Sequence, residues 1–518
     1  MQRLASSRSG RLFRTRSQAV LLLVAGSWCL ATSAFGQSVV SGAVVEAQRL
    51  RDTGQLTAAV ELLQTQLASN PNDGEAARLL AQTLYWLRDL SGARRAYDDA
   101  LQRHPEDTTL RLEYGRMLVE TRAWAPAEAL LTPLQQLDGP RARATALLGT
   151  MAYWQGDLSR AQRLFMEALS LDSNQPEIAG SLRQIRNGAA PWVRISSNVR
   201  HDDQPLDYFG AGIEAGWFAT PLVPLTMHFK PKTYRLPGGV VRRAWSAEGM
   251  VDSAWPSRHL ETQLAAGVLQ RDVPDGIEWT GRAALGVRVA SAVKLRVRAE
   301  RAPYLHTPSS LETSVNTDTI AGLVRLDHPR GWLGEVGMEQ QYFPDANRIR
   351  SQYAWLLMPL SMTERLKLQG GYAFEHSNAD ESRFEILTQP YDPSDPRFTT
   401  AGHYVPYYTP INLQSHSAVA ALSIDRSPRV AIRVSGSYGF RARDDSPVFF
   451  VVNGVVNRFS YRRTYSPWKV GGSLVFPVNQ RTTFGVAGEG GRTAFYSWSA
   501  VDVFMTFRFV STETASRR

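Results

Sequence analysis

Residues 293–300 read VKLRVRAE, and this stretch decides the fold of the second half of the chain. Apolar side chains occupy every second position, and the positions between them carry Lys, Arg, Arg and Glu. A period of two is typical of a β-strand with one apolar and one polar face. The same alternation returns at 365–375 and 429–441, in a region of short segments that runs from about Pro191 to Phe509. We therefore expect an antiparallel β-domain.

Two kinds of β-protein fit this alternation. In a soluble sandwich the apolar face would form the core, whereas in a transmembrane barrel it would face lipid and the charged face would line a wet lumen. The connections favour the barrel, because short turns such as Ser291-Ala292 alternate with longer links, the longest being 377–410. We predict about 16 strands, within a range of about 14 to 18, since Asn453-Gly454 centres a further hairpin.

The first half of the chain has a different period, of about 34 residues. The repeats align as 40–73, 74–107, 108–141 and 142–175 without insertions, and 176–187 reads as a capping helix. Small residues recur where the two helices of each pair would cross, namely Ala47, Ala81, Gly115 and Gly149 in the first helices and Ala59, Ala93, Ala127 and Ala161 in the second. Large apolar residues recur at another position, at Leu63, Tyr97, Leu131 and Phe165. This pattern closely resembles the tetratricopeptide family.

The resemblance implies an α-solenoid whose concave face is lined by the first helix of each pair. Aromatic rings on that face could stack on sugars or anchor a protein partner, and the alternative is that they pack between helices. The matching positions hold Arg78, Gln82, Tyr85, Trp86, Arg116, Thr150, Tyr153 and Trp154.

Residues 1–36 read as a secretory signal, with a basic start, an apolar core at 19–30 and small residues at Ala34 and Gly36. Cleavage after Ala34 is an alternative to cleavage after Gly36. The single cysteine, Cys29, lies inside this segment. The mature chain would then use neither disulfides nor thiolate chemistry.

The expected fold class is α + β multidomain: a signal at 1–36, a repeat domain of about four repeats with a capping helix at 37–188, and an antiparallel transmembrane β-barrel at 189–518. This order and size resemble bacterial exopolysaccharide exporters, the outer-membrane secretion subunits for poly-N-acetylglucosamine and for cellulose. The resemblance implies that a glycan polymer passes through an outer-membrane barrel. The periplasmic repeats would gather the polymer or its synthesis and processing proteins.

Other partners follow from the same expectations. The barrel would contact outer-membrane lipid, and its last apolar face, from Val501 to Phe509, resembles the terminal-strand signal read by the barrel assembly machinery. The repeats would bind periplasmic proteins, and nucleic acid is not expected for an exported chain.

A basic lumen would favour a neutral or anionic glycan over a cationic one. The alternative is that charged pairs only brace the barrel. The candidate lumen residues are Lys294, Arg296, Arg298, Glu335, Glu339, Arg365, Lys367, Arg429 and Arg433.

An enzyme and a scaffold are the alternatives to an exporter. An enzyme is not expected, because the sequence contains no His-Glu-x-x-His, no Gly-x-Ser-x-Gly, no phosphate-binding glycine loop and no clustered metal-ligand pattern. We accordingly expect no cofactor and no metal. A non-conducting barrel that anchors the repeats as a periplasmic scaffold is the remaining alternative.

Overall fold

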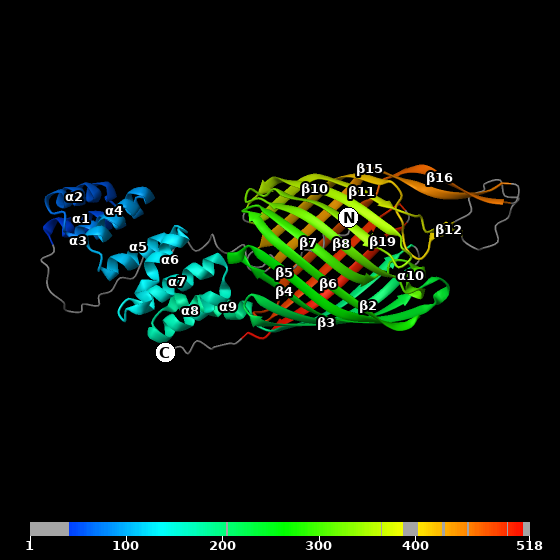
Figure 1. Cartoon of the computed structure of the whole chain (residues 1–518), viewed down its shortest axis with the longest axis horizontal. Helices are drawn as coiled ribbons and strands as arrows, with labels where there is room; N and C mark the ends of the chain where they lie inside the picture. Colours follow the sequence, from blue (N-terminus) through cyan, green and yellow to red (C-terminus); the bar gives the residue numbers. More distant parts are fainter. Residues whose placement is uncertain are drawn as a thin grey trace. The chain divides into compact units, whose positions relative to one another are not determined.

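The computed structural model describes residues 41–203, 206–363, 365–386, 402–426, 430–452, 455–494 and 496–510. The chain divides into two compact units, of which the first ends at Ile185 and the second begins at Arg186. Figure 1 shows the helices of the first unit and the strands of the second. The predicted secretory signal at 1–36 lies outside the described residues.

The helical unit contains four helix pairs and a terminal helix. The first helices are α1 (Gly42–Asp52), α3 (Gly74–Trp86), α5 (Thr108–Glu120) and α7 (Arg141–Gln155), and the second are α2 (Leu56–Ser69), α4 (Leu90–Arg103), α6 (Trp124–Leu131) and α8 (Leu158–Leu171), before α9 (Pro176–Gly188). Helix α6 is short because Pro133 starts the 3₁₀ helix η2 (Pro133–Gln136). The predicted α-solenoid is confirmed.

The helix pairs pack closely because small residues stand where the helices cross. A Cβ atom at Gly115 of α5 would lie 2.4 Å from Cδ2 of Leu131 in α6. At Gly149 of α7 it would lie 2.7 Å from Cδ1 of Phe165 in α8. Leu131 and Phe165 are buried, so neither can swing aside into water. The small and large positions predicted from the repeat are therefore sterically complementary.

Each helix pair turns through a left-handed backbone position. The turn residues with positive φ are spaced by the repeat length, at Gly54, Arg88, Arg122 and Gly156. Glycine adopts this conformation freely, whereas an arginine adopts it at a cost. The two middle repeats therefore carry a strained residue where the outer two do not.

The second unit is a closed antiparallel barrel. Its strands are β1 (Trp192–Asp202), β2 (Asp207–Thr220), β3 (Val223–Arg235), β4 (Val241–Trp255), β5 (Leu260–Asp272), β6 (Asp275–Ala290), β7 (Val293–Pro303), β8 (Asn316–Asp327), β9 (Leu333–Tyr342), β10 (Arg348–Met362), β11 (Leu366–Ala379), β14 (Leu413–Arg426), β15 (Val430–Val452), β16 (Val455–Tyr465), β17 (Trp468–Pro477), β18 (Thr482–Arg492) and β19 (Ser497–Arg508). The first and last strands pair, with Trp192 opposite Arg508 and Asp202 opposite Trp498. This pairing closes the sheet into a ring.

Strand β15 accounts for the number of strands. Its first part pairs with β17 and its second part with β16, so β16 and β17 are successive pieces of one returning strand. The barrel thus has 16 strands, as predicted. The second part of β15 and β16 form the predicted hairpin and run past the neighbouring strands (Figure 1). Its central Asn453-Gly454 lies outside the described residues.

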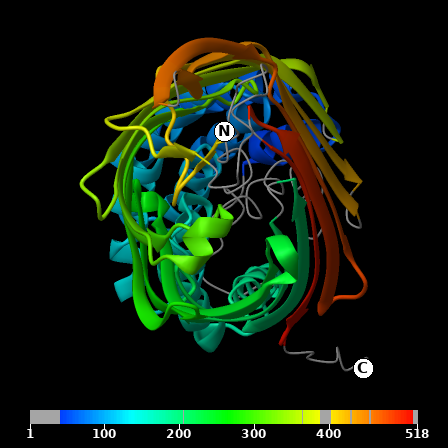
Figure 2. The same ribbon diagram turned by 90° about the vertical axis from the view of Figure 1, so that its right-hand side faces the viewer.

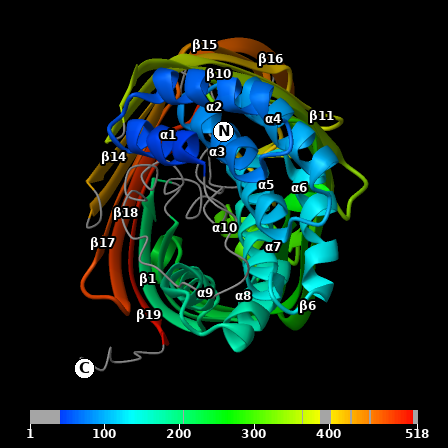
Figure 3. The same ribbon diagram turned by 90° about the vertical axis from the view of Figure 1, so that its left-hand side faces the viewer.

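The two ends of the barrel differ. We call the end where β1 begins the turn end, because short connections join the strands there. The other end, the loop end, carries helix α10 (Pro308–Glu312) between β7 and β8, and a small sheet of β12 (Phe384–Ile386) and β13 (Gly402–Tyr404) between β11 and β14. Helix α10 lies within the ring of strands when the barrel is viewed from either end (Figures 2 and 3).

The outer wall of the barrel is apolar. Ile195 of β1 stands opposite Ile213 of β2, and both side chains are more than half exposed. Outward aromatic residues form a belt near each end; on β17, Trp468 belongs to one belt and Phe476 to the other. A tilted strand spans roughly 20 Å between them, close to the apolar band of about 25 Å typical of membrane barrels. The apolar face therefore points outward, which excludes the soluble sandwich.

Candidate functional site

The predicted concave-face residues join successive first helices of the repeats. Arg78 of α3 forms an ion pair with Glu113 of α5, with Nη1 and Oε1 2.8 Å apart. The amide of Gln82 donates to the same glutamate at 2.6 Å and accepts from Arg51 of α1 at 3.1 Å. These contacts tie α1, α3 and α5 together. Arg51 and Glu113 were missed by the sequence analysis, although they lie 31 residues from Gln82, close to one repeat length.

The aromatic residues of this face divide into two kinds. Tyr85 donates to Glu120 at 2.6 Å, and Tyr153 donates to Gln184 of α9 at 2.9 Å. Burial and the hydrogen bond to Glu120 both raise the pKa of Tyr85. Trp86 and Trp154, in contrast, are 52% and 49% exposed. The two tryptophans therefore each expose about half of their surface to a ligand.

The other predicted residues of the face are placed as follows. The Arg51 guanidinium lies 4.8 Å over the Trp86 ring, a cation–π contact. Arg116 is exposed. Thr150 donates to the backbone carbonyl of Ala146 at 2.9 Å, so its hydroxyl is engaged within its own helix.

The charged face of β7 lines the inner wall of the barrel. Lys294, Arg296 and Arg298 alternate with the outward Leu295 and Val297. Their partners lie two strands away, so the side chains lie along the wall. Lys294 Nζ is 2.5 Å from Glu261 of β5, Arg296 donates to Gln263 of β5 at 3.1 Å, and Arg298 Nη2 is 2.9 Å from Glu339 of β9.

The remaining candidate lumen residues are less uniform. Glu335 of β9 accepts from the Tyr353 hydroxyl at 2.9 Å. Lys367 lies on the inner side of β11, because its register alternates with the exposed Leu368. Arg433 faces inward near the turn end, 3.7 Å from Asp425. Arg365 precedes β11 and belongs to the turn instead of the wall, and Arg429 lies outside the described residues.

These inward groups are open to water. The side chains of Lys294 and Glu261 keep 26% and 40% of their surface exposed, although they face the inside of a closed barrel. Accessible surface there requires a solvated interior. Most basic groups of the wall therefore meet a carboxylate or an amide and also border water, an arrangement in which charged pairs brace the barrel.

Helix α10 is fastened to the inner wall at the loop end. Leu311 packs in a buried cluster with Leu206, Tyr234 and Leu236. Arg271 of β5 donates to the carbonyl oxygens of Ser310 and Thr313 at 3.0 and 3.2 Å, and it pairs with Glu278 of β6. The guanidinium is buried, so these contacts are shielded from water. The segment around α10 is therefore a fixed part of the barrel interior.

The α10 segment also contacts the long loop between β11 and β14. The Thr307 hydroxyl donates to the carbonyl of Pro406 at 2.5 Å. The rings of Phe343 and Tyr407 stack with centroids 3.6 Å apart, and Tyr304 meets both edge-on. The β7–β8, β9–β10 and β11–β14 connections thus meet at the loop end.

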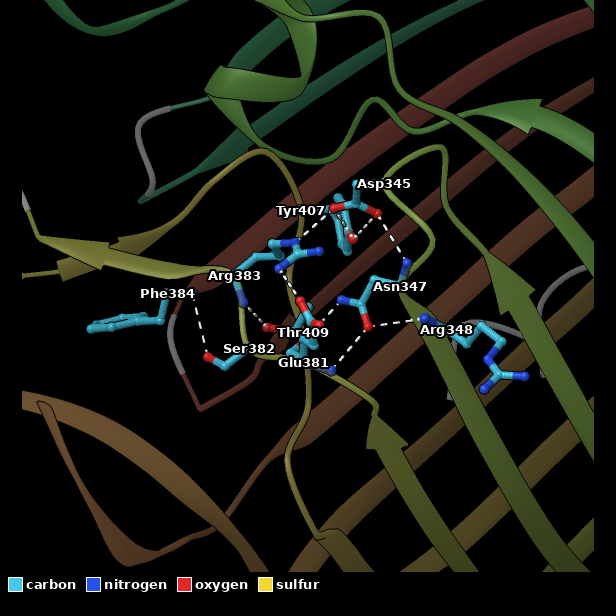
Figure 4. Close-up of polar contacts among 9 residues, drawn as sticks. All are labelled: Asp345, Asn347, Arg348, Glu381, Ser382, Arg383, Phe384, Tyr407 and Thr409. Atoms are coloured by element: carbon cyan, nitrogen blue, oxygen red, sulfur yellow. Dashed lines mark hydrogen bonds and ion pairs between the residues drawn. The ribbon is translucent and has the colours of Figure 1, made fainter.

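A polar hub holds the stem of the long loop (Figure 4). The Asp345 carboxylate accepts from the Tyr407 hydroxyl at 2.8 Å and from Arg383 Nε at 2.6 Å. Asn347 donates to the Glu381 carbonyl at 2.9 Å and accepts from the Glu381 N–H at 3.0 Å. Burial by itself would raise the pKa of Asp345, but the hydrogen bonds from Tyr407 and Arg383 outweigh it and lower that pKa.

The segment before α10 contains a histidine, His306. It has access to water, yet many protein atoms lie around it. This enclosure, reinforced by the positive charges of Arg200 and Lys232, lowers the pKa of His306 to about 4. The ring stands edge-on to Tyr304, with centroids 5.0 Å apart. His306 is therefore neutral near pH 7.

No helix within the described ranges has the length and apolar character needed to cross a membrane.

Comparisons with known proteins extend the description of both units. No family model matches the chain. The formate-dependent nitrite reductase complex subunit NrfG of Escherichia coli O157:H7 is 25% identical over 135 residues, which cover 25% of this chain and 68% of that protein. A solved bacterial polysaccharide outer membrane secretin matches 62% of this chain and 99% of its own, with a TM-score of 0.45 and 13% identity. PilF of Pseudomonas aeruginosa matches 28% of this chain and 66% of its own, with a TM-score of 0.27 and 22% identity.

These likenesses are too distant to supply a function, so what the chain does must be inferred from its own residues. The geometry establishes the architecture. A solenoid of tetratricopeptide type is followed by a closed antiparallel barrel of 16 strands, with an apolar exterior and a charged interior.

Proposed function

We propose that this chain is an outer-membrane exporter of an exopolysaccharide and that its repeats bind the polymer, or its synthesis and processing proteins, in the periplasm. The observation that carries the proposal is the contrast between the two faces of the barrel. Apolar residues such as Ile195 and Val297 cover the outside, while water-accessible charges such as Lys294 and Glu261 line the inside. Only a barrel that separates lipid from water needs both.

The connections support one orientation of the barrel. Strand β1 begins at Trp192, just after α9 ends at Gly188, so the repeats join the barrel at its turn end. Short turns are typical of the periplasmic side and longer loops of the external side. We therefore propose that the repeats lie in the periplasm and the α10 segment outside.

The chemistry of the lumen suits transport of a sugar polymer better than catalysis. Groups already engaged with one another, such as Arg298 with Glu339 and Arg296 with Gln263, offer a hydroxyl-rich chain many weak hydrogen bonds and no tight site. A moving polymer requires that balance. On the periplasmic side, the open rings of Trp86 and Trp154 provide surfaces on which sugars or a partner protein can stack. We propose that the protein acts without an enzymatic step.

A second candidate function is favoured by the loop end. The contacts of Thr307 with Pro406 and of Phe343 with Tyr407 hold three connections together at the mouth of the barrel. A barrel that stays closed there would serve as a membrane anchor for a periplasmic scaffold.

Single-channel conductance of the full-length protein in a planar bilayer separates the two. We expect low conductance from the wild type and a clear increase when residues 306–313 are replaced by a glycine-serine linker of equal length. Neutral or acidic oligosaccharides should then block that current. Heat-modifiable migration on a gel would show that both proteins carry a folded barrel. A folded linker variant that conducts no more than the wild type would contradict export and favour the anchored scaffold.

A further inference from the structure

The outer surface of the loop end carries arginines on one side of the barrel. Arg350 of β10 stands opposite Asn378 of β11, Arg443 of β15 stands opposite Gln414 of β14, and Arg462 of β16 stands opposite Asp445 of β15. Arg350 and Arg462 are 49% and 62% exposed. We call this set, with its neighbours Arg348 and Arg441, the arginine rim.

The register shows that the rim faces outward. Arg350 lies an even number of residues before Leu356 and Met358 on β10, and both of these are exposed on the apolar wall. Between Arg441 and Tyr438 the register of β15 shifts by one residue, so Phe440 and Arg441 are both exposed. The bulge thus places an aromatic ring and a cation side by side on the outer face.

The rim lies directly beyond the aromatic belt. On β11 and β14, the Tyr372 hydroxyl is 2.6 Å from Nδ1 of His416, and His416 stands opposite Arg441. The Phe374 ring is 5.2 Å from the same histidine. Aromatic belts mark the level at which acyl chains meet head groups. Arg441 and Arg443 therefore lie at head-group depth.

Carboxylates only partly neutralise the rim. Asp380 forms ion pairs with Arg348 and Arg350 at 2.8 and 2.9 Å, and Asp445 pairs with Arg462 at 3.2 Å. Gln414, which accepts from Arg443 Nε at 3.1 Å, adds no negative charge.

Two outward arginines on the far wall, over β4 to β8, each lie beside a carboxylate. There Arg301 pairs with Asp318 at 3.3 Å, and the backbone N–H of Arg243 donates to Asp272 at 2.8 Å. Each of these two arginines therefore has a carboxylate beside it, whereas in the rim Arg348 and Arg350 share Asp380.

We propose that the arginine rim binds the phosphate groups of a phosphorylated glycolipid in the outer leaflet of the membrane. Guanidinium groups bind phosphate through paired, charge-assisted hydrogen bonds. Anionic head groups also offset the electrostatic repulsion among the clustered arginines. Sugar-linked phosphates at head-group depth can reach Arg441 and Arg443 while the acyl chains lie against the Tyr372 and Tyr438 rings below. The assignment to the outer leaflet rests on the orientation given with the proposed function.

Lipid binding by the full-length protein in a neutral detergent tests this inference. The probe is diphosphorylated lipid A, compared with the same lipid after removal of its phosphates and with phosphatidylglycerol. The readout is the fraction of lipid-bound protein by native mass spectrometry. The double variant Arg441→Gln/Arg443→Gln should bind diphosphorylated lipid A about 30-fold more weakly, since each arginine contributes about fivefold. The matched control Arg243→Gln/Arg301→Gln changes the same number of charges on the far wall and should bind like the wild type.

Each other result has a definite meaning. Equal binding of the dephosphorylated lipid would overturn the inference, and so would equal losses in the two double variants. Equal affinity for phosphatidylglycerol would show that the rim binds anionic lipids in general and would also contradict a glycolipid site. Heat-modifiable migration of both variants guards against misfolding. Conductance is measured in parallel. A conducting barrel that fails to bind the lipid would contradict the lipid site and leave the export proposal intact. A non-conducting barrel that binds the lipid would contradict export and leave the lipid site intact.

Discussion

The repeat unit and the barrel both stack similar elements side by side, but different parts of the chain hold the elements together. In the repeats, side-chain size sets the geometry, because Gly115 fits against Leu131 with no room for one more carbon. In the barrel, backbone hydrogen bonds between neighbouring strands hold the wall, so inward side chains such as Lys294 need only tolerate water and one another. Side-chain size is consequently constrained at the helix crossings, whereas lumen residues can be substituted without disturbing the fold.

The largest expected effect concerns the lumen residue that departs from this rule. Arg271→Met removes the hydrogen bonds to Ser310 and Thr313 and leaves Glu278 buried without its cation. Breaking a buried pair typically costs about 3–5 kcal/mol. Here that loss would weaken the attachment of α10 to the inner wall. We expect a higher single-channel conductance with an unchanged heat-modifiable barrel.

The matched control is Lys294→Met, which removes a cation from a water-accessible pair with Glu261. Exposed pairs contribute about 0–1 kcal/mol, so the conductance should hardly change. If both variants opened the barrel equally, the distinction between buried and water-accessible lumen charges would be wrong.

Overpacking a helix crossing should have the next largest effect. Gly115→Val places a side chain against Leu131 and should destabilise the repeats by about 1–3 kcal/mol. The helical signal at 222 nm should then melt at a lower temperature while the barrel stays heat-modifiable. Gly180→Ala, in the open surroundings of α9, is the control and should melt at the same or a slightly higher temperature. A fall of equal size in Gly180→Ala would mean that crossings are not special.

Acid should loosen the loop end in two steps and leave the strands intact. His306 has a pKa of about 4 when packed and 6.5 when released, so the released segment takes up a proton first, and attachment weakens as pH falls from 6.5 to 4. The pKa of Asp345 is lowered in the hub, so its contribution is complete above 3.8 and is lost as pH falls through the lowered value. Conductance between pH 8 and 3 should rise in both windows.

Single variants assign the two steps. His306→Gln should abolish the rise between pH 6.5 and 4, and Asp345→Asn should abolish the rise below pH 4, each leaving the other in place. A pH profile unchanged in both variants would show that other groups govern the mouth.

The smallest effect should be a gain in stability at the repeat turns. Arg88→Gly and Arg122→Gly give these left-handed positions the residue found at Gly54 and Gly156. Relief of the backbone strain should raise the free energy of unfolding of the repeats by about 1 kcal/mol each. Urea melts followed at 222 nm would measure it. Arg88→Ala removes the same charge but keeps the strain, and an equal gain in that variant would point to charge instead of backbone.

The sequence predicted what depends on short periods. Glycine and alanine at fixed spacing located the helix crossings, and alternation in 293–300 located a strand with its inner and outer faces. Contacts between distant strands were not predictable in this way. The partner of Arg298 is Glu339, two strands away in the barrel, and only the closed register brings them together.

The loop end shows the same limit more strongly. The hub joins Asp345 to Arg383 and Tyr407, which lie in segments without any period, and α10 is a single turn of helix held by Arg271 from another hairpin. The arginine rim depends on a one-residue bulge beside Phe440, and no pattern in the sequence predicts this bulge. Irregular backbone therefore carries most of the features that were missed.

The pairing of β1 with β19 also orders events in time. The strand that follows the repeats has its final neighbour only at the far end of the barrel segment, since Trp192 meets Arg508. The repeats depend on contacts between neighbours in sequence and can fold as soon as they are made, whereas the cylinder cannot be sealed until the last strand has emerged. During that interval β1 has an exposed edge, and a chaperone or insertion factor that shields this edge would control the yield of the finished protein.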